Sequence, residues 1–524
     1  MSWLKQNKLL IILIIVFLLL NNLPYLAGLY KSINNPDINY NASPLVNEGD
    51  YFVYLSFIEQ GRDNVFIKNL YDYQADQATL FNPLWFSVGQ VAKFSSNIID
   101  YHSFRLLFTL AFIAMLWWWL KKIFENYKKR ILALATILFA NGLGVLFLSF
   151  RPNTGVSPVN LWVSESNTFL NLYQGPLFSL SQALILLVFA LFISAYKKSL
   201  NKLIPIYFLI SLFLFISHPY ELVIINFPLT VWVLIEFWQK RNKKIFYYLF
   251  WLYLSSLIGG LYYLWLFQDP SMARYREQNI VSSGNILEYF FGFGLVTIFS
   301  FIGAWLAIKK RWIKNTYLKF LLVWALSGWL MVYLPLSFNR RLSNGWHIPL
   351  VILSFLAIAY IYKKVPNLFK GGLIAIIAIS LFFDTLYHVL LYTDQSYNDS
   401  RGANVYSSVQ RKSIYEIMDL TMANDSIVLT RELEGNRLPA YINARVYIGH
   451  SIQTWEADKK NEETKKIWTS QENISSWLKE HNIDYIFASR KYIEEIDNIK
   501  WLAQEPYIKA IVNDDDFIFY QFIE

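Results

Sequence analysis

The sequence predicts a polytopic α-helical membrane protein of about eleven transmembrane helices, followed by a C-terminal α/β domain outside the membrane. Three observations predict this class. Hydrophobic residues make up 55% of the 524 residues, charged residues only 16%, and the mean hydropathy is +0.30. The apolar residues come in blocks long enough to cross the roughly 30 Å of a bilayer core. Residues 393–524 instead alternate helical and strand patterns.

Eleven apolar runs predict the membrane spans. The first follows MSWLKQNK and is read as a retained helix, because no A-x-A-like cleavage site follows it. The fifth and sixth runs are short and meet at SHPYE, where Pro219 interrupts the pattern, so this pair could also be one broken hairpin. The expected spans are 9–29, 103–120, 131–150, 176–196, 203–217, 222–238, 245–266, 288–308, 316–336, 347–362 and 372–392.

The distribution of Lys and Arg predicts the orientation. The N-terminal segment and the short loops of one side carry 22 basic residues, the short loops of the other side carry 5, and the bias does not break along the chain. Cytoplasmic loops carry the excess of Lys and Arg. We therefore expect a protein of the cytoplasmic membrane with its N-terminus inside. A transmembrane domain would cover 1–392, with a first outer loop at 30–102, and an extracytoplasmic domain would cover 393–524.

Composition also excludes several functions. The net charge of +9 divides into −7 on residues 393–524 and +16 on the rest, so the basicity reflects cytoplasmic anchoring and not nucleic-acid binding. The chain has no cysteine, which excludes disulfides, thiolate nucleophiles and Cys-ligated metals. It has no H-E-x-x-H, Walker A or G-x-S-x-G motif.

The C-terminal domain shows its own pattern of elements. A closing β pair is expected around NDDD. Helices are expected at 406–422, 456–467 and 472–481, and strands at 425–430, 444–449, 483–489, 508–513 and 517–523.

Two adjacent arginines, Arg340 and Arg341 in FNRRLSNGWHIPL, lie on the outer face by this topology. They run against the inside bias of basic residues, which requires an anionic partner. One interpretation pairs them with lipid headgroups or structural carboxylates. The other has their guanidinium groups bind a phosphate, whose oxygens suit planar bidentate donors. His347 could add a further donor.

The acidic candidates face the same side. Glu48 and Asp50 in NEGDYFVYLSFIEQG precede an amphipathic stretch of the first outer loop. Asp50 could simply begin a helix, but a carboxylate fixed at the membrane surface is also what a hydroxyl-activating base requires.

Other ionisable or polar residues belong to this outer layer and are candidates by default. Asp384 and His388 lie four residues apart, which is more typical of a local helix contact than of a metal site, so a divalent metal stays an open alternative. The further candidates are Glu165, His218, Tyr220 and Glu221.

The order of motifs along the chain resembles the bacterial polytopic glycosyltransferases of the C superfamily, GT-C. The motifs are an Asp soon after helix one, FNPLWFSVGQVA, YHSFRLLF, a WxxE loop, an HPY break, RRLxxGxHIPL and VYIGHSIQT. The resemblance implies inverting transfer of a sugar from a polyprenyl-phosphate-linked donor to a glycan, lipid or protein acceptor on the outer face. Asp50 would be the base, with Glu48 as the nearest substitute, and Arg340 and Arg341 would hold the lipid phosphate.

Two features bear on alternatives. The WWD-type motif of protein-modifying members has no counterpart, because the only WWW, Trp117 to Trp119, ends a helix at the cytoplasmic side, which argues against an oligosaccharyltransferase role. A transporter or flippase could bind an anionic lipid without chemistry, but no internal repeat supports it. A scaffold in which the helices only anchor the outer domain would not need eleven spans.

Overall fold

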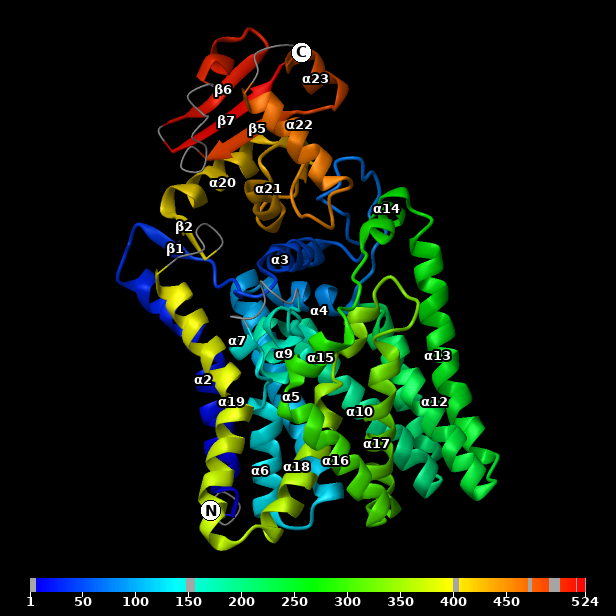
Figure 1. Ribbon diagram of the computed structural model, residues 1–524. Helices are drawn as coiled ribbons and strands as arrows, with labels where there is room; N and C mark the ends of the chain where they lie inside the picture. Colours follow the sequence, from blue (N-terminus) through cyan, green and yellow to red (C-terminus); the bar gives the residue numbers. More distant parts are fainter. Residues whose placement is uncertain are drawn as a thin grey trace.

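The computed structural model describes residues 6–147, 156–398, 405–469, 474–489, 500–514 and 516–523. Figure 1 shows a helical bundle below and a small domain containing a β-sheet above, with an intermediate layer of short helices and loops between them. The N-terminus lies at the far end of the bundle from the C-terminal domain, as the predicted topology requires.

Eight helices or helix pairs are long and apolar enough to cross a membrane, judged by length and composition over the described residues. Helices α2 and α19 pack side by side at one edge of the bundle (Figure 1). The helices of this set are α2 (Lys8–Ile33), α5 (Asn97–Ile123), α6 (Tyr127–Phe139) with α7 (Gly144–Phe147), α10 (Pro176–Lys198), α12 (Glu221–Lys240), α13 (Lys244–Leu266), α18 (His347–Lys364) and α19 (Asn367–Asn398).

The remaining predicted spans correspond to shorter or bent helices. Helices α11 (Ile204–Ser217) and α17 (Thr316–Met331) are apolar but short. The expected single span at 288–308 is instead α15 (Ile286–Phe293) and α16 (Leu295–Lys309), bent by 90° at Gly294, whose φ of +54° lies in the left-handed region that glycine adopts without strain. The polytopic helical class is confirmed, while the count of eleven spans stays a prediction. The last three residues of the expected span 131–150 lie outside the described residues.

The outer layer is built mainly from the first outer loop and the short connections on the same side. Helix α3 (Glu48–Asp63) lies between the bundle and the C-terminal domain (Figure 1). Acidic residues in its first turn suit the positive end of the helix dipole. The other elements here are β1 (Ile38–Tyr40), α4 (Pro83–Ala92), η2 (Val159–Leu161), η3 (Ser164–Ser166), α9 (Thr168–Gln174), α14 (Pro270–Gln278) and η6 (Asn339–Ser343).

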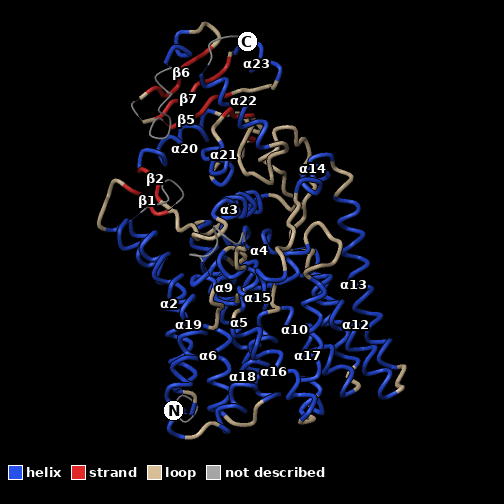
Figure 2. The backbone as a smooth tube through the Cα atoms, viewed as in Figure 1, coloured by secondary structure: helices blue, strands red, loops and turns tan. Residues whose placement is uncertain are grey.

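The C-terminal domain contains a five-stranded sheet of order β4-β3-β5-β7-β6. Strands β3 (Ile427–Leu429), β4 (Arg445–Val446) and β5 (Tyr485–Ser489) run parallel, and β3 and β5 are buried throughout, as expected where both faces of a sheet are covered. The predicted closing pair is the antiparallel hairpin β6 (Ile508–Asn513) and β7 (Phe517–Phe522). Figure 2 shows these strands gathered at the end of the molecule away from the bundle.

Helices complete this domain and largely follow the sequence prediction. They are α20 (Val409–Thr421), α21 (Glu432–Arg437), α22 (Ala457–Thr469) and α23 (Ile474–Glu480). The first expected helix begins with a strand, β2 (Tyr406–Ser408), and α21 was not expected. Further single 3-10 turns in the chain are η4 (Asn201–Leu203), η5 (Trp312–Lys314), η7 (Leu438–Ala440) and η10 (Lys500–Gln504).

Several contacts join the C-terminal domain to the rest of the chain. Strand β2 pairs antiparallel with β1 of the first outer loop. The Arg445 guanidinium donates to the backbone oxygens of Tyr73 and Ala75, at 2.8 and 3.2 Å.

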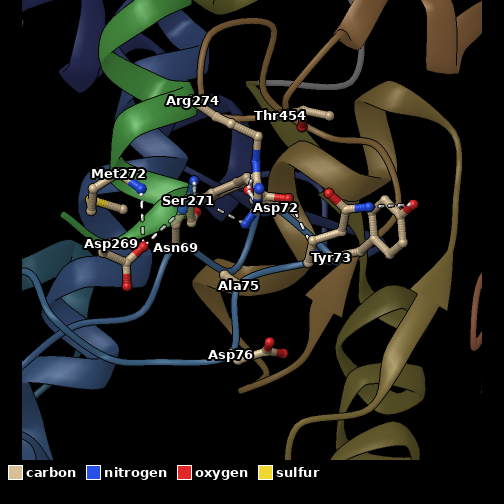
Figure 3. A network of polar contacts seen from close by, with 12 residues as sticks. Asn69, Asp72, Tyr73, Ala75, Asp76, Asp269, Ser271, Met272, Arg274 and Thr454 are labelled. Atoms are coloured by element: carbon tan, nitrogen blue, oxygen red, sulfur yellow. Dashed lines mark hydrogen bonds and ion pairs between the residues drawn. The ribbon is translucent and has the colours of Figure 1, made fainter. Parts of the chain in front are cut away.

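A further contact lies within the outer layer itself. In Figure 3, Arg274 of α14 reaches Asp72 of the first outer loop, at 2.6 Å between Nη2 and Oδ2. The proposed boundary at 392/393 falls inside α19, which continues to Asn398.

Candidate active site

A cavity of about 440 Å³ opens between the outer layer and the membrane helices. Its wall includes Asp50 from α3, His218 and Tyr220 from the break between α11 and α12, Arg341 from η6, and Gln453 from the C-terminal domain. Residues that are about 400 positions apart in the chain therefore share one space. The sequence analysis required Asp50 and an arginine of the pair to face the same side, and the structure brings them to the same cavity.

Asp50 is a partly exposed carboxylate whose Oδ1 lies 3.2 Å from Nε2 of His450; 29% of its side chain is exposed. Burial raises the pKa of Asp50, but the hydrogen bond from His450 and the charges of Arg341 and Arg340 outweigh it, so the pKa is held below its ordinary value. The carboxylate is thus ionised at neutral pH and can accept a proton.

Glu48 occupies a different face of the same helix. Successive residues of an α-helix are 100° apart, so positions i and i+2 point in nearly opposite directions. Asp50 contributes to the cavity wall and Glu48 does not. Of the two carboxylates that the sequence offered as a base, Asp50 has the suitable position.

The Arg341 side chain is partly buried and has no carboxylate at ion-pair distance among the described residues. Its guanidinium carbon lies 4.8 Å from the centre of the Tyr220 ring, a cation–π contact. Its Nε is buried and has no hydrogen-bond partner, and no acidic group of the described residues lies within ion-pair distance of the guanidinium. The side chain therefore retains donors that can bind an anion in the cavity.

Arg340 points elsewhere. In a 3-10 helix adjacent residues are 120° apart, so neighbouring side chains of η6 diverge. The Arg340 guanidinium lies 4.8 Å from the Trp162 ring, and Trp162 lines a separate cavity of about 670 Å³. We expected both arginines to bind one phosphate, but only Arg341 lines the cavity that contains Asp50.

A buried polar network fixes the arginine loop. Glu221 is fully buried and accepts hydrogen bonds from Ser181 and from Nδ2 of Asn344, the latter at 2.7 Å. Nδ1 of His218 lies 2.8 Å from the same carboxylate oxygen. Asn344 follows η6 directly, so the network joins α10, α12 and the segment that carries Arg341. We assign Glu221 and His218 to positioning this loop.

Two other predicted site residues lie outside the cavity wall. Glu165 in η3 is buried and accepts from Ser164 Oγ at 3.2 Å. His347 begins α18, is buried, and has Nδ1 at 2.9 Å from Thr168 Oγ1. Neither of them reaches the space between Asp50 and Arg341.

The Asp384 and His388 pair is a local helix contact. Nδ1 of His388 lies 2.6 Å from the backbone oxygen of Asp384, while the Asp384 carboxylate accepts from Nδ2 of Asn160 at 2.6 Å. Across the part of the chain that the structure describes, no three His, Asp or Glu side chains converge as metal ligands.

Sequence reasoning missed two contributors to the site. His450 and Gln453 come from VYIGHSIQT, which was noted as a motif but given no role. Their approach to α3 depends on contacts across the whole chain. Tyr275 and Asn279 also line the cavity, and the Asn279 amide donates to the Tyr220 hydroxyl at 3.2 Å.

The arrangement of apolar helices under an outer layer with a C-terminal domain resembles the fold of solved oligosaccharyltransferases. Its structural neighbours include the oligosaccharyltransferase AglB of the archaeon Archaeoglobus fulgidus, solved with an inhibitory peptide and a dolichol-phosphate. That match has 11% identity and a TM-score of 0.56, and covers 96% of this chain and 71% of that one.

A second structure, of the Archaeoglobus fulgidus oligosaccharyltransferase tethered with an acceptor peptide, matches with 12% identity and a TM-score of 0.55. That match covers 93% of this chain and 70% of the other. At this identity the likeness is one of fold, and it confirms the fold class expected from the motifs. No family model and no curated relative matches the sequence.

Proposed function

We propose that this protein is an inverting glycosyltransferase that moves a sugar from a polyprenyl-phosphate-linked donor to an acceptor on the extracytoplasmic face. The observation that carries the proposal is that Asp50 and Arg341 line one cavity. Structural neighbours of the same fold are oligosaccharyltransferases, and one of them was solved with a dolichol-phosphate. Both facts support a lipid-phosphate donor here.

The proposed chemistry needs one base and one cation. The Asp50 carboxylate removes the proton of the incoming acceptor hydroxyl as its oxygen attacks the anomeric carbon. The bond from the anomeric carbon to the phosphate oxygen breaks, and its electron pair leaves with the phosphate. Arg341 stabilises that negative charge, so no general acid is required. A single displacement inverts the anomeric centre.

The cavity also suits the lipid part of such a donor. Apolar residues of α12 and α13, Leu222, Val223 and Leu266, line it together with the polar groups. A polyprenyl chain needs apolar contact with its phosphate held beside a cation. The base and the cation do not determine which sugar is transferred. They also do not determine whether the acceptor is a glycan, a lipid or a protein.

The test is Asp50→Asn, which keeps the shape of the side chain and removes its basicity. We expect turnover to fall by about 10²- to 10⁴-fold. Transfer is measured in liposomes from polyprenyl-phosphate sugars, and donor binding is measured separately by competition with polyprenyl phosphate. Asp76→Asn is the matched control, because Asp76 lies in the same loop with 88% of its side chain exposed.

Three results would contradict parts of the proposal. Wild-type turnover in Asp50→Asn together with an inactive Glu48→Gln would move the base to Glu48. Activity in both variants would remove the base altogether. Movement of the lipid donor across the bilayer without any transferred sugar would identify a transporter instead.

The proposed orientation places the N-terminus in the cytoplasm and residues 393–524 outside. The chain has no cysteine, so single cysteines report directly. In intact cells an impermeant thiol reagent should label Lys412→Cys, which is 75% exposed in α20, and not Lys310→Cys at the other end of the bundle. The reverse pattern would invert the topology.

A further inference from the structure

The C-terminal domain reaches the cavity through one histidine. His450 lies in the segment Gly449–Thr454, directly after the strand pattern that contains β4, and its ring is 8% exposed. Its Nε2 is 3.2 Å from Oδ1 of Asp50. This is the one contact at hydrogen-bonding distance that the described residues make with the Asp50 carboxylate.

The backbone around His450 determines which ring nitrogen carries the proton. Nδ1 accepts hydrogen bonds from the backbone N–H groups of Ile452 and Gln453, at 3.1 and 3.2 Å. A nitrogen that accepts cannot also be protonated, so the proton resides on Nε2. The ring therefore presents an N–H donor to Asp50, which leaves the other carboxylate oxygen of Asp50 for a substrate.

The segment that carries His450 is fixed on both sides. Within it, the backbone N–H of Thr454 donates to the His450 oxygen at 2.9 Å, and Gly449 N–H donates to Thr454 Oγ1 at 3.1 Å. The Gln278 amide of α14 donates to the Thr454 oxygen at 2.8 Å. Figure 3 shows Thr454 in the same outer network as Arg274 and Asp72. The imidazole is held in place before any substrate arrives.

Helix α3 leaves room for this ring. Gly49 precedes Asp50, and a Cβ built at Gly49 would lie 3.1 Å from Cδ2 and 3.2 Å from Nε2 of His450. These distances are tighter than ordinary van der Waals contact, so a methyl group here would push the ring away. A glycine inside a helix costs stability relative to alanine. At position 49 the absence of a side chain allows the close approach of the His450 ring.

We propose that His450 is a positioning residue for Asp50, through which the docked C-terminal domain orients the carboxylate toward the acceptor hydroxyl. The inference rests on the proposed function, since it assigns Asp50 the role of base. It gives the C-terminal domain a part in the reaction without direct contact with the reacting atoms. Partners that orient the ligands of metal sites contribute about 10- to 100-fold in activity, and we expect an effect of similar size for a partner that orients a base.

The experiment compares His450→Ala with His450→Gln in the full-length protein. Glutamine can present an N–H near the position of Nε2, whereas alanine cannot. We expect kcat to fall about 10- to 100-fold in the alanine variant and to recover in part with glutamine, with unchanged competition by polyprenyl phosphate. His481→Gln is the matched control, because His481 lies in the same domain and packs on Trp477 away from the cavity.

The pH profile separates positioning from folding. The hydrogen bond from His450 lowers the pKa of Asp50. The acidic limb of the kcat/KM profile should therefore move to higher pH in His450→Ala, and less in His450→Gln. A role limited to folding would reduce the amount of folded protein and leave the limb where it is.

Gly49→Ala provides a second, independent variant in case His450→Ala does not fold. The methyl group of alanine would lie 3.1 Å from Cδ2 of His450, so it should displace the ring and lower kcat. Wild-type kcat and pH profile in both His450→Ala and Gly49→Ala would overturn the inference. Equal losses in His450→Ala, His450→Gln and His481→Gln would overturn it as well. Wild-type turnover in Asp50→Asn would instead refute the role of Asp50 as the base, on which this inference rests.

Discussion

The charged groups at the two ends of helix α12 differ in whether they have an oppositely charged partner. At the inner end, Glu236 is fully buried and contacts two ammonium groups, Lys240 at 2.6 Å and Lys319 at 2.5 Å. At the outer end, Arg341 lies beside Tyr220 with no carboxylate at ion-pair distance among the described residues. Charges that are balanced within the protein stabilise the fold, whereas a partly buried cation with no carboxylate at ion-pair distance can bind an anion that comes from elsewhere.

The largest expected effect comes from removing the Glu236 carboxylate, which pairs with Lys240 and Lys319. Glu236→Gln leaves Lys319 and Lys240 without their carboxylate, and the loss of one partner of a buried ion pair costs on the order of 3 kcal/mol. Arg341→Leu removes a cation with no such partner and should leave the melting temperature unchanged or higher. Thermal unfolding in detergent compares the two. Equal destabilisation by both substitutions would make Arg341 a structural residue and remove the contrast.

A smaller effect separates the two adjacent arginines. Arg341→Lys keeps the charge but loses the planar donor pair, and a charge-assisted hydrogen bond contributes about 1.5–3 kcal/mol. We expect polyprenyl phosphate to compete roughly 10- to 100-fold less well. Arg340→Lys should change it less, because Arg340 stacks on Trp162 outside this cavity.

Arg311→Lys, exposed at the inner end, is the control for these measurements. Equal losses in Arg340→Lys and Arg341→Lys would show that both guanidinium groups bind the same phosphate, as the sequence alone suggested.

The smallest expected effect concerns another buried cation, Lys460 of α22. Its ammonium is buried between the rings of Tyr73 and Tyr447, 4.5 and 5.3 Å from their centres, and its Nζ has no hydrogen-bond partner in the described part of the chain. Burial lowers the pKa of Lys460 to about 8. A lysine can thus lose its charge, which an arginine cannot.

This difference predicts a pH dependence of stability. Between pH 8 and the unfolded pKa of 10.5, the unfolded chain binds the proton that the folded protein has released, so the free energy of unfolding rises with pH across this window. Lys460→Met should flatten that rise, whereas its exposed neighbour in Lys459→Met should not. Identical slopes for the wild type and Lys460→Met would show that Lys460 keeps its charge.

The fold could be predicted largely because the membrane imposes it. Each of the eight candidate spans found among the described residues falls on an apolar run predicted from the sequence, since a bilayer requires long apolar helices. It could not show the 90° bend at Gly294, because hydropathy reports composition and not direction. In the C-terminal domain, alternation and apolar runs located β3, β5, β6 and β7. The short α21 has too few residues for a helical period to appear.

The site was harder to predict because its parts meet only in three dimensions. Asp50 and Arg341 could be proposed, since charge on the outer face is conspicuous in a sequence with this topology. The divergence of Arg340 from Arg341 depends on the 3-10 geometry of η6, which the sequence does not show. The contact of His450 with Asp50 joins residues 400 positions apart.

The pairing of β1 with β2 has a consequence for how the protein is made. Ile38 lies opposite Ser408, so the first outer loop is completed by a strand that the ribosome makes only after all the membrane helices. Loop closure over so many residues is slow, and chains fold largely in the order of synthesis. Asp50 thus has no contact with His450 during most of translation, because His450 is synthesised 400 residues later. The outer layer, and with it the contact of His450 with Asp50, is therefore completed only near the end of translation.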